Sequence, residues 1–282
     1  MANLKQLDPS ASPLDYYGAE LRRLREAAGL TLADLGKILF CTGSLIGQIE
    51  TTAKVPTRDF SARVDAALGT DGMFTRLVGL VIQSQLPKWF QPFAELEAKA
   101  TYISTYQAQL VYGLLQTPEY ARAVLEMGNV AKVDELVAAR LERQRILDAP
   151  HPPLTLVILD EGAFHRPMGS HEMMRAQLGH LLDYGKRPWV QIQVLPYSAG
   201  PHASLEGSFT DLRFQSDPEI IYTEDLISGH MTANPETVRE AARRYASLQA
   251  AALSMEDSAN LIKRVMEERY EPDSAVGEPS VA

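Results

Sequence analysis

The sequence lacks several features that would assign it to particular classes of protein. It has one cysteine, Cys41, which cannot form an internal disulfide and is too few for a zinc site. Its longest apolar runs, such as residues 154–159, are far shorter than the roughly 18 residues that a membrane span needs. The N-terminus has no apolar segment behind a basic cluster, so we expect no signal peptide, no membrane association and a cytoplasmic protein.

Motifs of the common enzyme classes are also missing. There is no G-x-S-x-G elbow, no P-loop and no G-x-G-x-x-G after an expected strand, so we do not expect an enzyme. His165 and His171 follow Asp160 and Glu161 closely, which could indicate a metal or acid–base site. Their spacing matches no zinc motif, and histidines in ordinary loop contacts are the favoured alternative. We therefore expect neither a metal nor a cofactor.

Charge is distributed unevenly along the 282 residues. Residues 1–69 hold eight Lys and Arg against eight Asp and Glu, whereas residues 70–282 hold nineteen against twenty-eight and carry the whole net charge of −9. An acidic body is repelled by DNA. If the chain binds DNA, the neutral N-terminal segment must do so through individually placed side chains, because it has no bulk basic field.

The chain is long enough for two domains, and its 45% hydrophobic and 22% charged residues are typical of a soluble globular protein. The sequence predicts a mainly α N-terminal helix-turn-helix domain and a larger α+β C-terminal domain with a small mixed sheet. The expected segments are a flexible arm (1–14), the helix-turn-helix domain (15–70), a connecting helix (71–90), the α+β domain (91–270) and a flexible tail (271–282).

The α+β expectation comes from residue periodicity in the second half. Apolar residues at three- and four-residue spacing predict helices over 92–108, 118–127, 134–148, 170–184, 235–254 and 257–269. Short apolar or alternating runs predict strands over 154–159, 190–195, 207–214 and 220–223. A strand–helix–strand pattern followed by a hairpin favours a small mixed sheet covered by helices.

The N-terminal block predicts four short helices separated by tight turns. Thr31, with Asp34 three residues later, is typical of a capping box, and Thr42 can cap the next helix. Leu35, Ile38 and Leu39 form the expected apolar stripe of the second helix. Two short helices joined by a tight turn have helix-turn-helix geometry. Here the pair is the second and third of the four helices, and the third, the recognition helix, is the one that enters the major groove of DNA. The alternative is that any small helical domain contains such a pair.

Several side chains in and near the recognition helix have the chemistry of base or phosphate contacts. Gln can bond adenine in two places, Ser and Thr can bond bases or phosphates, Leu can touch a thymine methyl group, and Lys and Arg suit phosphates. The candidate DNA-binding residues are Thr31, Thr42, Gly43, Ser44, Leu45, Gln48, Lys54 and Arg58.

These residues carry a resemblance to a known family. R-R-L-R-E-A-A-G-L-T-L-A-D-L-G-K-I-L (22–39) and S-L-I-G-Q-I-E (44–50) resemble the Xre or lambda-repressor type of helix-turn-helix. The resemblance implies a structural salt bridge between Arg25 on the first helix and Glu50 at the end of the recognition helix. Leu32 stands where the family often has a phosphate-contacting glutamine. Gly43 and Gly47 lie inside the recognition helix, where each costs roughly 1 kcal/mol of helix propensity.

The resemblance extends beyond the N-terminal block. G-L-L-Q-T-P-E-Y-A-R-A-V (113–124), V-Q-I-Q-V-L-P-Y-S-A-G-P-H-A-S-L-E-G-S-F-T-D-L-R-F (190–214) and A-L-S-M-E-D-S-A-N-L-I (252–262) resemble WhiJ-like regulators of actinobacteria, with Tyr112 where that family usually has proline. The resemblance implies a regulator of development or specialised metabolism with an antitoxin-like C-terminal domain. Such regulators are often encoded beside a small companion protein that binds them.

Four residues of the C-terminal domain are candidates for binding a ligand or partner. Arg140 and Arg143 lie on an expected helix and could hold an anion, although a solvated helix face is the more common reason for such residues. His202 and Ser204 lie in a glycine-containing segment after the strand end at Leu195. They could line a pocket, or the segment could be a plain loop.

The sequence thus predicts a nucleoid-associated, sequence-specific transcriptional regulator, a repressor rather than an activator. Its C-terminal domain is expected to bind a small companion protein or a ligand and so control DNA occupancy. The expected partners are a second copy in a homodimer and double-stranded DNA with an inverted-repeat operator. The alternative is an antitoxin-like module that mainly sequesters a partner protein, with DNA binding secondary.

Overall fold

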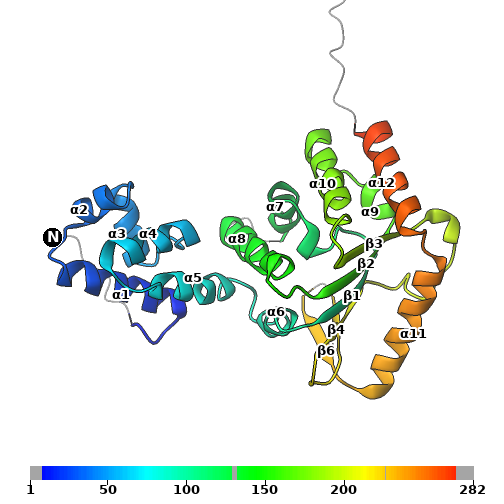
Figure 1. The fold of residues 1–282 in the computed structure, drawn as a ribbon, viewed down its shortest axis with the longest axis horizontal. Helices are drawn as coiled ribbons and strands as arrows, with labels where there is room; N and C mark the ends of the chain where they lie inside the picture. The colour runs from blue at the N-terminus through cyan, green and yellow to red at the C-terminus, as the bar shows by residue number, and fades with distance from the viewer. Residues whose placement is uncertain (1–7, 129–131, 226, 271–282) are drawn as a thin grey trace, which may run out of the picture. The chain divides into compact units, whose positions relative to one another are not determined.

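The computed structural model describes residues 8–128, 132–225 and 227–270, which fall into two compact units divided between Gln91 and Pro92 (Figure 1). The N-terminal unit is helical and the C-terminal unit contains a six-stranded sheet. The expected fold class, a mainly α helix-turn-helix domain with a larger α+β domain, is confirmed. The tail expected over 271–282 lies outside the described residues.

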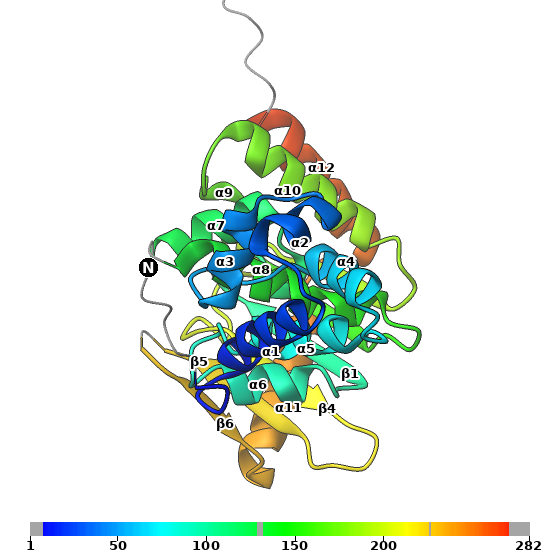
Figure 2. The ribbon, with the colours of Figure 1, turned by 90° about the vertical axis from the view of Figure 1, so that its left-hand side faces the viewer.

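The described residues of the N-terminal unit form five helices: the four that the sequence predicts for the helix-turn-helix domain and one more after them. They are α1 (Pro13–Ala27), α2 (Leu32–Ile38), α3 (Gly43–Glu50), α4 (Arg58–Leu68) and α5 (Met73–Gln83), drawn in blue and cyan in Figure 2. The fifth is the helix expected as a connector over 71–90, but it packs against α1 and α4 and belongs to this unit. α1 begins at Pro13 with Ser12 as its cap, inside the segment 1–14 that the sequence predicts to be an arm; residues 1–7 of that segment lie outside the described part.

Side chains far apart in sequence hold α5 in place. The residue before α5 offers no side-chain cap. Instead, Asp65 of α4 accepts hydrogen bonds from the backbone nitrogens of Phe74 and Thr75, both at 2.8 Å. Burial opposes ionisation of Asp65, but these bonds and others from nearby threonines lower its pKa below the ordinary value. From α1, Tyr17 contacts Phe74 with ring centroids 4.9 Å apart and bonds Ser61 at 2.8 Å.

The sheet of the C-terminal unit is mixed, as expected, with strand order β3-β2-β1-β4-β5-β6. Its strands are β1 (Tyr102–Gln107), β2 (Leu154–Asp160), β3 (Val190–Leu195), β4 (Phe209–Arg213), β5 (Ile220–Glu224) and β6 (Gly229–Thr232). The first three run parallel, and β4, β5 and β6 continue from β1 as antiparallel neighbours.

One secondary-structure expectation is wrong. Residues 102–107, predicted to be the end of a helix, form β1, an interior strand of the sheet. The segment Y-I-S-T-Y-Q is rich in aromatic and β-branched residues, which favour strands. β1 pairs with β2 and with β4, so most of its surface is buried by segments distant in sequence.

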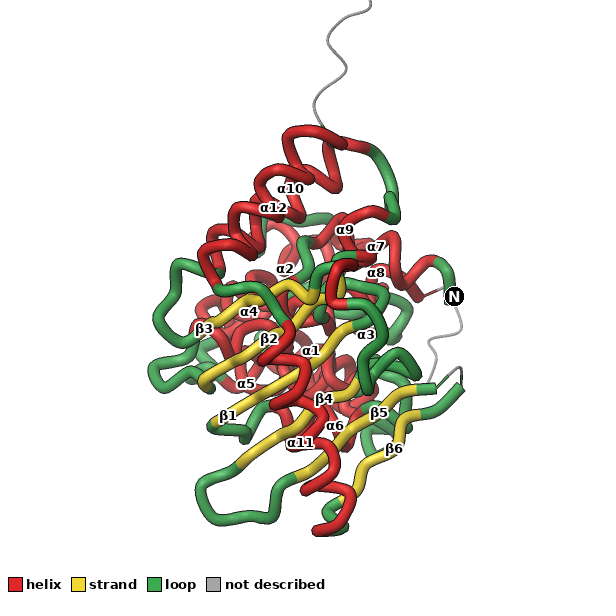
Figure 3. Tube along the Cα trace, turned by 90° about the vertical axis from the view of Figure 1, so that its right-hand side faces the viewer, coloured by secondary structure: helices red, strands yellow, loops and turns green. Residues whose placement is uncertain are grey.

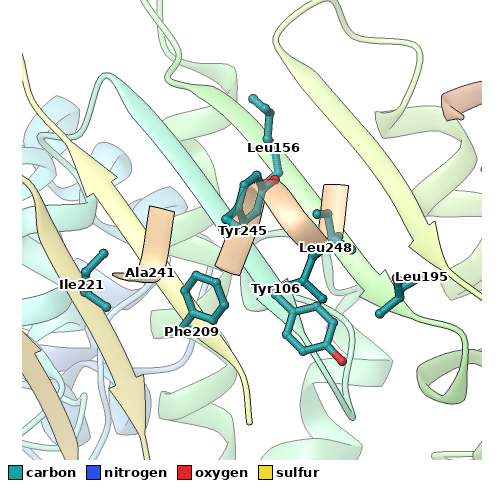
Figure 4. Packing of buried hydrophobic residues seen from close by; sticks show 9 residues of the cluster. Tyr106, Leu156, Leu195, Phe209, Ile221, Ala241, Tyr245 and Leu248 are labelled. Carbon is teal, nitrogen blue, oxygen red and sulfur yellow. The ribbon is translucent and has the colours of Figure 1, made fainter. Parts of the chain in front are cut away.

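Helices cover both faces of this sheet, and the other expected helices are present within one or a few residues at their ends. They are α6 (Gln91–Glu97), α7 (Pro118–Glu126), α8 (Val133–Gln144), α10 (His171–Tyr184), α11 (Pro235–Ala251) and α12 (Met255–Arg269). The short α9 (Gly162–His165) is not among the helices that the sequence predicts. Figure 3 shows α11 crossing one face diagonally. On that face, Tyr245 and Leu248 of α11 pack against Tyr106, Leu156 and Phe209 of the sheet (Figure 4).

No single helix in the described ranges is long and apolar enough to cross a membrane. The pair α2 and α3 reaches the required length and composition only when taken together, across a bend of 111°. Both helices contribute buried side chains to the helical unit, among them Leu35 and Ile46.

Candidate functional site

Helices α2 and α3 each begin with the capping interaction that the sequence predicts. Thr31 Oγ1 accepts a hydrogen bond from Asp34 N at 3.1 Å, and Asp34 Oδ2 accepts one from Thr31 N at 3.2 Å, which completes a capping box. Thr42 Oγ1 accepts from Leu45 N at 3.2 Å and begins α3. One prediction for α2 is wrong: Ile38, expected on its buried apolar stripe, is 46% exposed.

Two glycines allow α2 and α3 to approach each other closely. A Cβ on Gly36 would lie only 2.9 Å from the oxygen of Cys41 and from the nitrogen of Gly43. A Cβ on Gly43 would lie 3.1 Å from the nitrogen of Ala33 and the oxygen of Leu32. Gly43, which the sequence offers as a DNA contact, therefore has a packing role at the start of α3.

The two sides of α3 differ in exposure. Ile46 and Ile49 are buried at 0% and 1% exposure, as expected for the side that faces the other helices. Thr42, Ser44 and Gln48 are exposed. Because Ser44 and Gln48 are four residues apart, they lie on one face of the helix. The structure thus presents a short polar face with the residue types that read bases in a major groove.

The remaining DNA-binding candidates occupy different positions. Thr31 and Lys54 are exposed, and Leu45 is half-buried. The Arg58 guanidinium lies against α5, with Nη2 3.3 Å from the position that a Cβ on Gly79 would occupy. Lys54 is therefore the better placed of the two basic candidates for a phosphate contact next to α3.

A buried ion pair links α1 to the end of α3, as the family resemblance implies. Arg25 Nε and Nη2 donate to the two carboxylate oxygens of Glu50 at 2.5 and 2.9 Å, and the side chains are 10% and 2% exposed. The hydrogen bond to Glu50 raises the pKa of Arg25. Arg22, which the sequence reading missed, donates to the Glu50 backbone oxygen at 3.1 Å. It lies three residues before Arg25 on the same helix face.

The glycines of α3 provide a first test. Gly43→Ala is expected to destabilise the N-terminal unit by about 1–3 kcal/mol, because its Cβ meets backbone atoms that cannot move independently. Gly47→Ala is expected to stabilise the unit by about 1 kcal/mol, because its Cβ meets only a Leu32 methyl group at 3.5 Å and helix propensity improves.

The measurement is urea unfolding of the full chain. The chain has two tryptophans, Trp89 in the N-terminal unit and Trp189 in the C-terminal unit. In a Trp189→Phe background, fluorescence reports on the N-terminal unit. Shifts of the same sign for the two alanine variants would contradict the close approach at Gly43.

A second buried ion pair lies in the C-terminal unit. Arg143 Nε and Nη2 donate to the carboxylate of Glu97 at 2.8 and 2.9 Å, and the side chains are 7% and 1% exposed. Tyr112 donates its hydroxyl to the same carboxylate at 2.8 Å. Burial, and then the nearby Glu97 charge, raise the pKa of Tyr112 well above its usual value. Arg143 therefore has a counter-ion and does not lie on a solvated helix face.

Arg140 is tied to the loop over 113–117. Its Nη1 donates to Gln116 Oε1 at 2.7 Å, and burial together with Arg143 lowers its pKa to about 10. Gln144 and Gln177 donate side-chain N–H groups to backbone oxygens of the same loop. As expected, Thr117 caps α7. The G-L-L-Q-T-P segment thus runs from a short 3-10 helix (Gly113–Leu115) to the first residue of α7, and surrounding side chains bond its backbone oxygens.

His202 and Ser204 lie near the carboxyl ends of the parallel strands. His202 Nε2 is 3.5 Å from Tyr106 Oη and 3.9 Å from Asp160 Oδ2, and the Tyr106 hydroxyl donates to Asp160 at 3.3 Å. Ser204 N donates to His202 Nδ1 at 3.4 Å. Ser204 is 2% exposed, and its Oγ has no hydrogen-bond partner among the described residues.

The structure does not bring the two sets of ligand candidates together. Tyr106, beside His202, belongs to the core under α11. Glu97, the partner of Arg143, is on α6, where Phe93 stacks on Tyr222 at 3.9 Å. Tyr222 alternates along β5 with Ile221, which faces α11, so Phe93 lies on the other face of the sheet.

The histidines near Asp160 do not form a metal site. Within the described ranges, no group of three or more His, Cys, Asp or Glu side chains could hold a metal ion. His165 Nε2 faces Glu161 Oε1 at 3.3 Å, and the His171 ring packs against Tyr270 with centroids 5.6 Å apart. These are the ordinary contacts that the alternative interpretation predicts.

Comparisons with known proteins follow the division of the structure. Residues 17–75 match a family described as a helix-turn-helix domain. Residues 90–264, more than half of the chain, match a domain of unknown function, DUF5753. No curated protein and no solved structure matches the chain. The helix-turn-helix domain is of the type found in DNA-binding regulators.

Proposed function

We propose that this chain, which belongs to the family of the domain of unknown function DUF5753, is a sequence-specific DNA-binding transcriptional repressor. The observation that carries the proposal is the exposed polar face of α3, formed by Thr42, Ser44 and Gln48 in a helix-turn-helix domain. The opposite side of α3 is fixed by buried isoleucines and by the Arg25–Glu50 pair. A fixed helix with an exposed polar face suits base recognition in a major groove.

The proposal includes a homodimer and an inverted-repeat operator. Residues 1–69 have no net positive charge, so one N-terminal unit can make few phosphate contacts and should bind a single half-site weakly. Two linked units bind with a high effective concentration at the second half-site. Recognition helices related by a two-fold axis then require half-sites about 10–10.5 base pairs apart, or a multiple of that spacing.

The C-terminal unit has a regulatory role in this proposal and no catalytic one. The resemblance of residues 113–124, 190–214 and 252–262 to WhiJ-like regulators supports binding of a small companion protein. Binding of that protein, or of a ligand, to the acidic body would change the occupancy of DNA by the N-terminal units. The site of action is then the nucleoid.

The experiment that tests the proposal is recovery of DNA bound by the full-length protein, followed by gel-shift titration of the enriched site. Gln48→Ala is expected to weaken binding to that site by about 1–3 kcal/mol, roughly 5- to 150-fold, with little change on random DNA. Lys54→Ala is the comparison, because loss of a phosphate contact should weaken binding to both DNAs equally.

Two outcomes would overturn the proposal. An unchanged preference of Gln48→Ala for the enriched site would show that α3 does not read bases. A wild-type protein that copurifies with a partner protein and binds all DNA equally loosely would favour the sequestering module instead.

A further inference from the structure

The two edges of the six-stranded sheet differ in whether other segments bond their outward-facing backbone groups. At the β3 edge, Leu253 N donates to Val194 O and Val194 N donates to Ser258 Oγ, both at 2.9 Å. The Gln193 side chain also donates to Leu253 O at 2.8 Å. Leu253 and the first turn of α12 therefore occupy the hydrogen-bonding positions of Val194 that another strand would need at this edge.

Among the described residues, none covers the opposite edge, β6, in this way. In the described part of the chain, β6 is the last strand of the sheet and pairs only with β5. Asp225 N donates to Ser228 O at 2.9 Å, so these two opposite residues form a hydrogen-bonded pair. Along an antiparallel ladder, hydrogen-bonded and non-hydrogen-bonded pairs of opposite residues alternate. The backbone groups of His230 therefore point towards β5, and those of Gly229 and Met231 point away from the sheet.

The residues of this edge do not oppose strand addition. Native proteins discourage pairing at an exposed edge with charged side chains, proline or bulges. The sequence G-H-M-T of β6, with Ala233 after it, contains no proline, lysine or carboxylate. Met231 is 37% exposed and nearby Ile227 is 80% exposed. An uncovered edge with these residues is a template for another strand.

We propose that β6 pairs with β6 of a second copy of the chain, antiparallel and about a two-fold axis that passes beside Met231. This inference rests on the proposed function, which requires two N-terminal units. The second copy is the occupant that fits the residues of this edge. The acidic excess of residues 70–282 opposes contact between two copies in general, so close approach is favoured where carboxylates are few. β6 itself has none, and the nearby Asp225 carboxylate contacts His230 Nε2 at 3.0 Å. Antiparallel pairing of identical strands about a two-fold axis is also self-complementary.

Alternation along the strand sets the register. The residues whose backbone N–H and C=O groups point away from β5 are odd-numbered. Gly229, Met231 and Ala233 must therefore bond residues of the second copy whose backbone groups also point outward. An axis beside Met231 pairs Met231 with its own equivalent and Gly229 with Ala233, and it places His230 opposite Thr232. An axis beside His230 would place two imidazoles directly opposite each other and lose the Ala233 pairs. The first register is therefore the favoured one.

Cross-linking of the full-length protein tests this register. Residues in a bonded antiparallel pair have Cα atoms about 5.5 Å apart, within the range of a disulfide. In a Cys41→Ser background, Met231→Cys is expected to give a disulfide-linked dimer under mild oxidation. Met255→Cys is the matched control, because Met255 is also an exposed methionine, 54% accessible, at the start of α12. Equal cross-linking of both variants, or of neither, overturns the proposal.

Sedimentation without DNA gives an independent measurement. A strand of four residues makes a small contact, so the wild-type protein is expected to dimerise reversibly with concentration. Met231→Lys places two like charges opposite each other and is expected to weaken dimerisation by about tenfold or more, whereas Met255→Lys leaves it unchanged. An unchanged dimerisation constant for Met231→Lys overturns the inference.

These results are separable from the test of DNA reading. A protein that prefers its enriched DNA site but dimerises elsewhere, or not at all, overturns only the β6 interface. A protein that dimerises through β6 without any DNA preference overturns only the proposed regulatory function.

Discussion

Glu50→Ala is expected to destabilise the N-terminal unit by about 3–5 kcal/mol, because it leaves the buried Arg25 guanidinium without its carboxylate. The lost contacts are the paired hydrogen bonds at 2.5 and 2.9 Å, and also the 3.5 Å ion pair with Arg22. The measurement is urea unfolding of the full chain in a Trp189→Phe background, in which Trp89 reports on the N-terminal unit.

A double-mutant cycle separates the pair from its surroundings. Arg25→Ala also destabilises, since Arg25 additionally donates to Leu30 O at 2.9 Å. The double variant should be less destabilised than the sum of the two single variants, by about 0.5–3 kcal/mol. The control is the exposed Arg23–Glu20 pair of the same helix, whose removal should cost less than about 1 kcal/mol. Strictly additive losses at Arg25 and Glu50 would show that the two side chains are not coupled.

The Arg25–Glu50 pair also bears on DNA binding. It fixes α1 to the last residue of α3, so it sets how the exposed face of α3 is presented. Gly36 and Gly43 fix the other end of α3 by allowing contact with α2. A helix held at both ends loses little conformational freedom when it binds, which favours affinity from the few contacts that Ser44 and Gln48 can make.

The local features of the N-terminal unit could be predicted from the sequence because their causes are local. The Thr31 and Thr42 caps each depend on a residue three positions away. The position of α5 could not be predicted in the same way. It depends on Asp65 and on Tyr17, which lies more than fifty residues before α5, and no periodicity within 71–90 reveals those contacts.

Prediction of the strands was limited in the same way, because the contacts that define β1 lie far away in the sequence. β2 and β3 are strongly apolar or regularly alternating, and their sequences predict them. β1 contains Ser104 and Thr105, which look like surface residues but are buried at 1% and 0% exposure. Both find partners on β4, where Thr105 bonds Thr210 at 2.8 Å. Polar residues satisfied by a strand about a hundred residues away do not show a strand pattern in their own segment.

The candidate sites follow the same rule. Residue type and helical spacing correctly placed Arg140 and Arg143 together on one helix, but not the counter-ion of Arg143. That counter-ion is Glu97, 46 residues earlier in the chain. Tyr112, singled out by the resemblance as a departure from proline, supplies a third hydrogen bond to this carboxylate. The substitution thus has a structural role that no pattern within residues 112–118 could indicate.

Glu97→Ala is expected to destabilise the C-terminal unit by about 3–5 kcal/mol, since Arg143 would then be a buried charge without a partner. Tyr112→Phe removes only one hydrogen bond to the carboxylate and should cost about 1–3 kcal/mol. Unfolding is followed in a Trp89→Phe background, in which the remaining indole, Trp189, bonds Leu147 O at 3.0 Å within this unit.

The replacement of both charges distinguishes the ion pair from simple packing. Burial opposes the charged form of Arg143, but the Glu97 carboxylate outweighs it and raises the arginine pKa. A guanidinium stays protonated in proteins even without a counter-ion, so removal of Glu97 leaves an unpaired charge. The double variant Glu97→Leu with Arg143→Leu should therefore be more stable than Glu97→Leu alone, because it leaves no unpaired charge. Lys186→Ala, which breaks an exposed pair with Asp183, is the control and should change stability by less than about 1 kcal/mol. A loss of less than about 1 kcal/mol for Glu97→Ala as well would mean that water reaches and solvates Arg143, and that the pair does not hold α6 to α8.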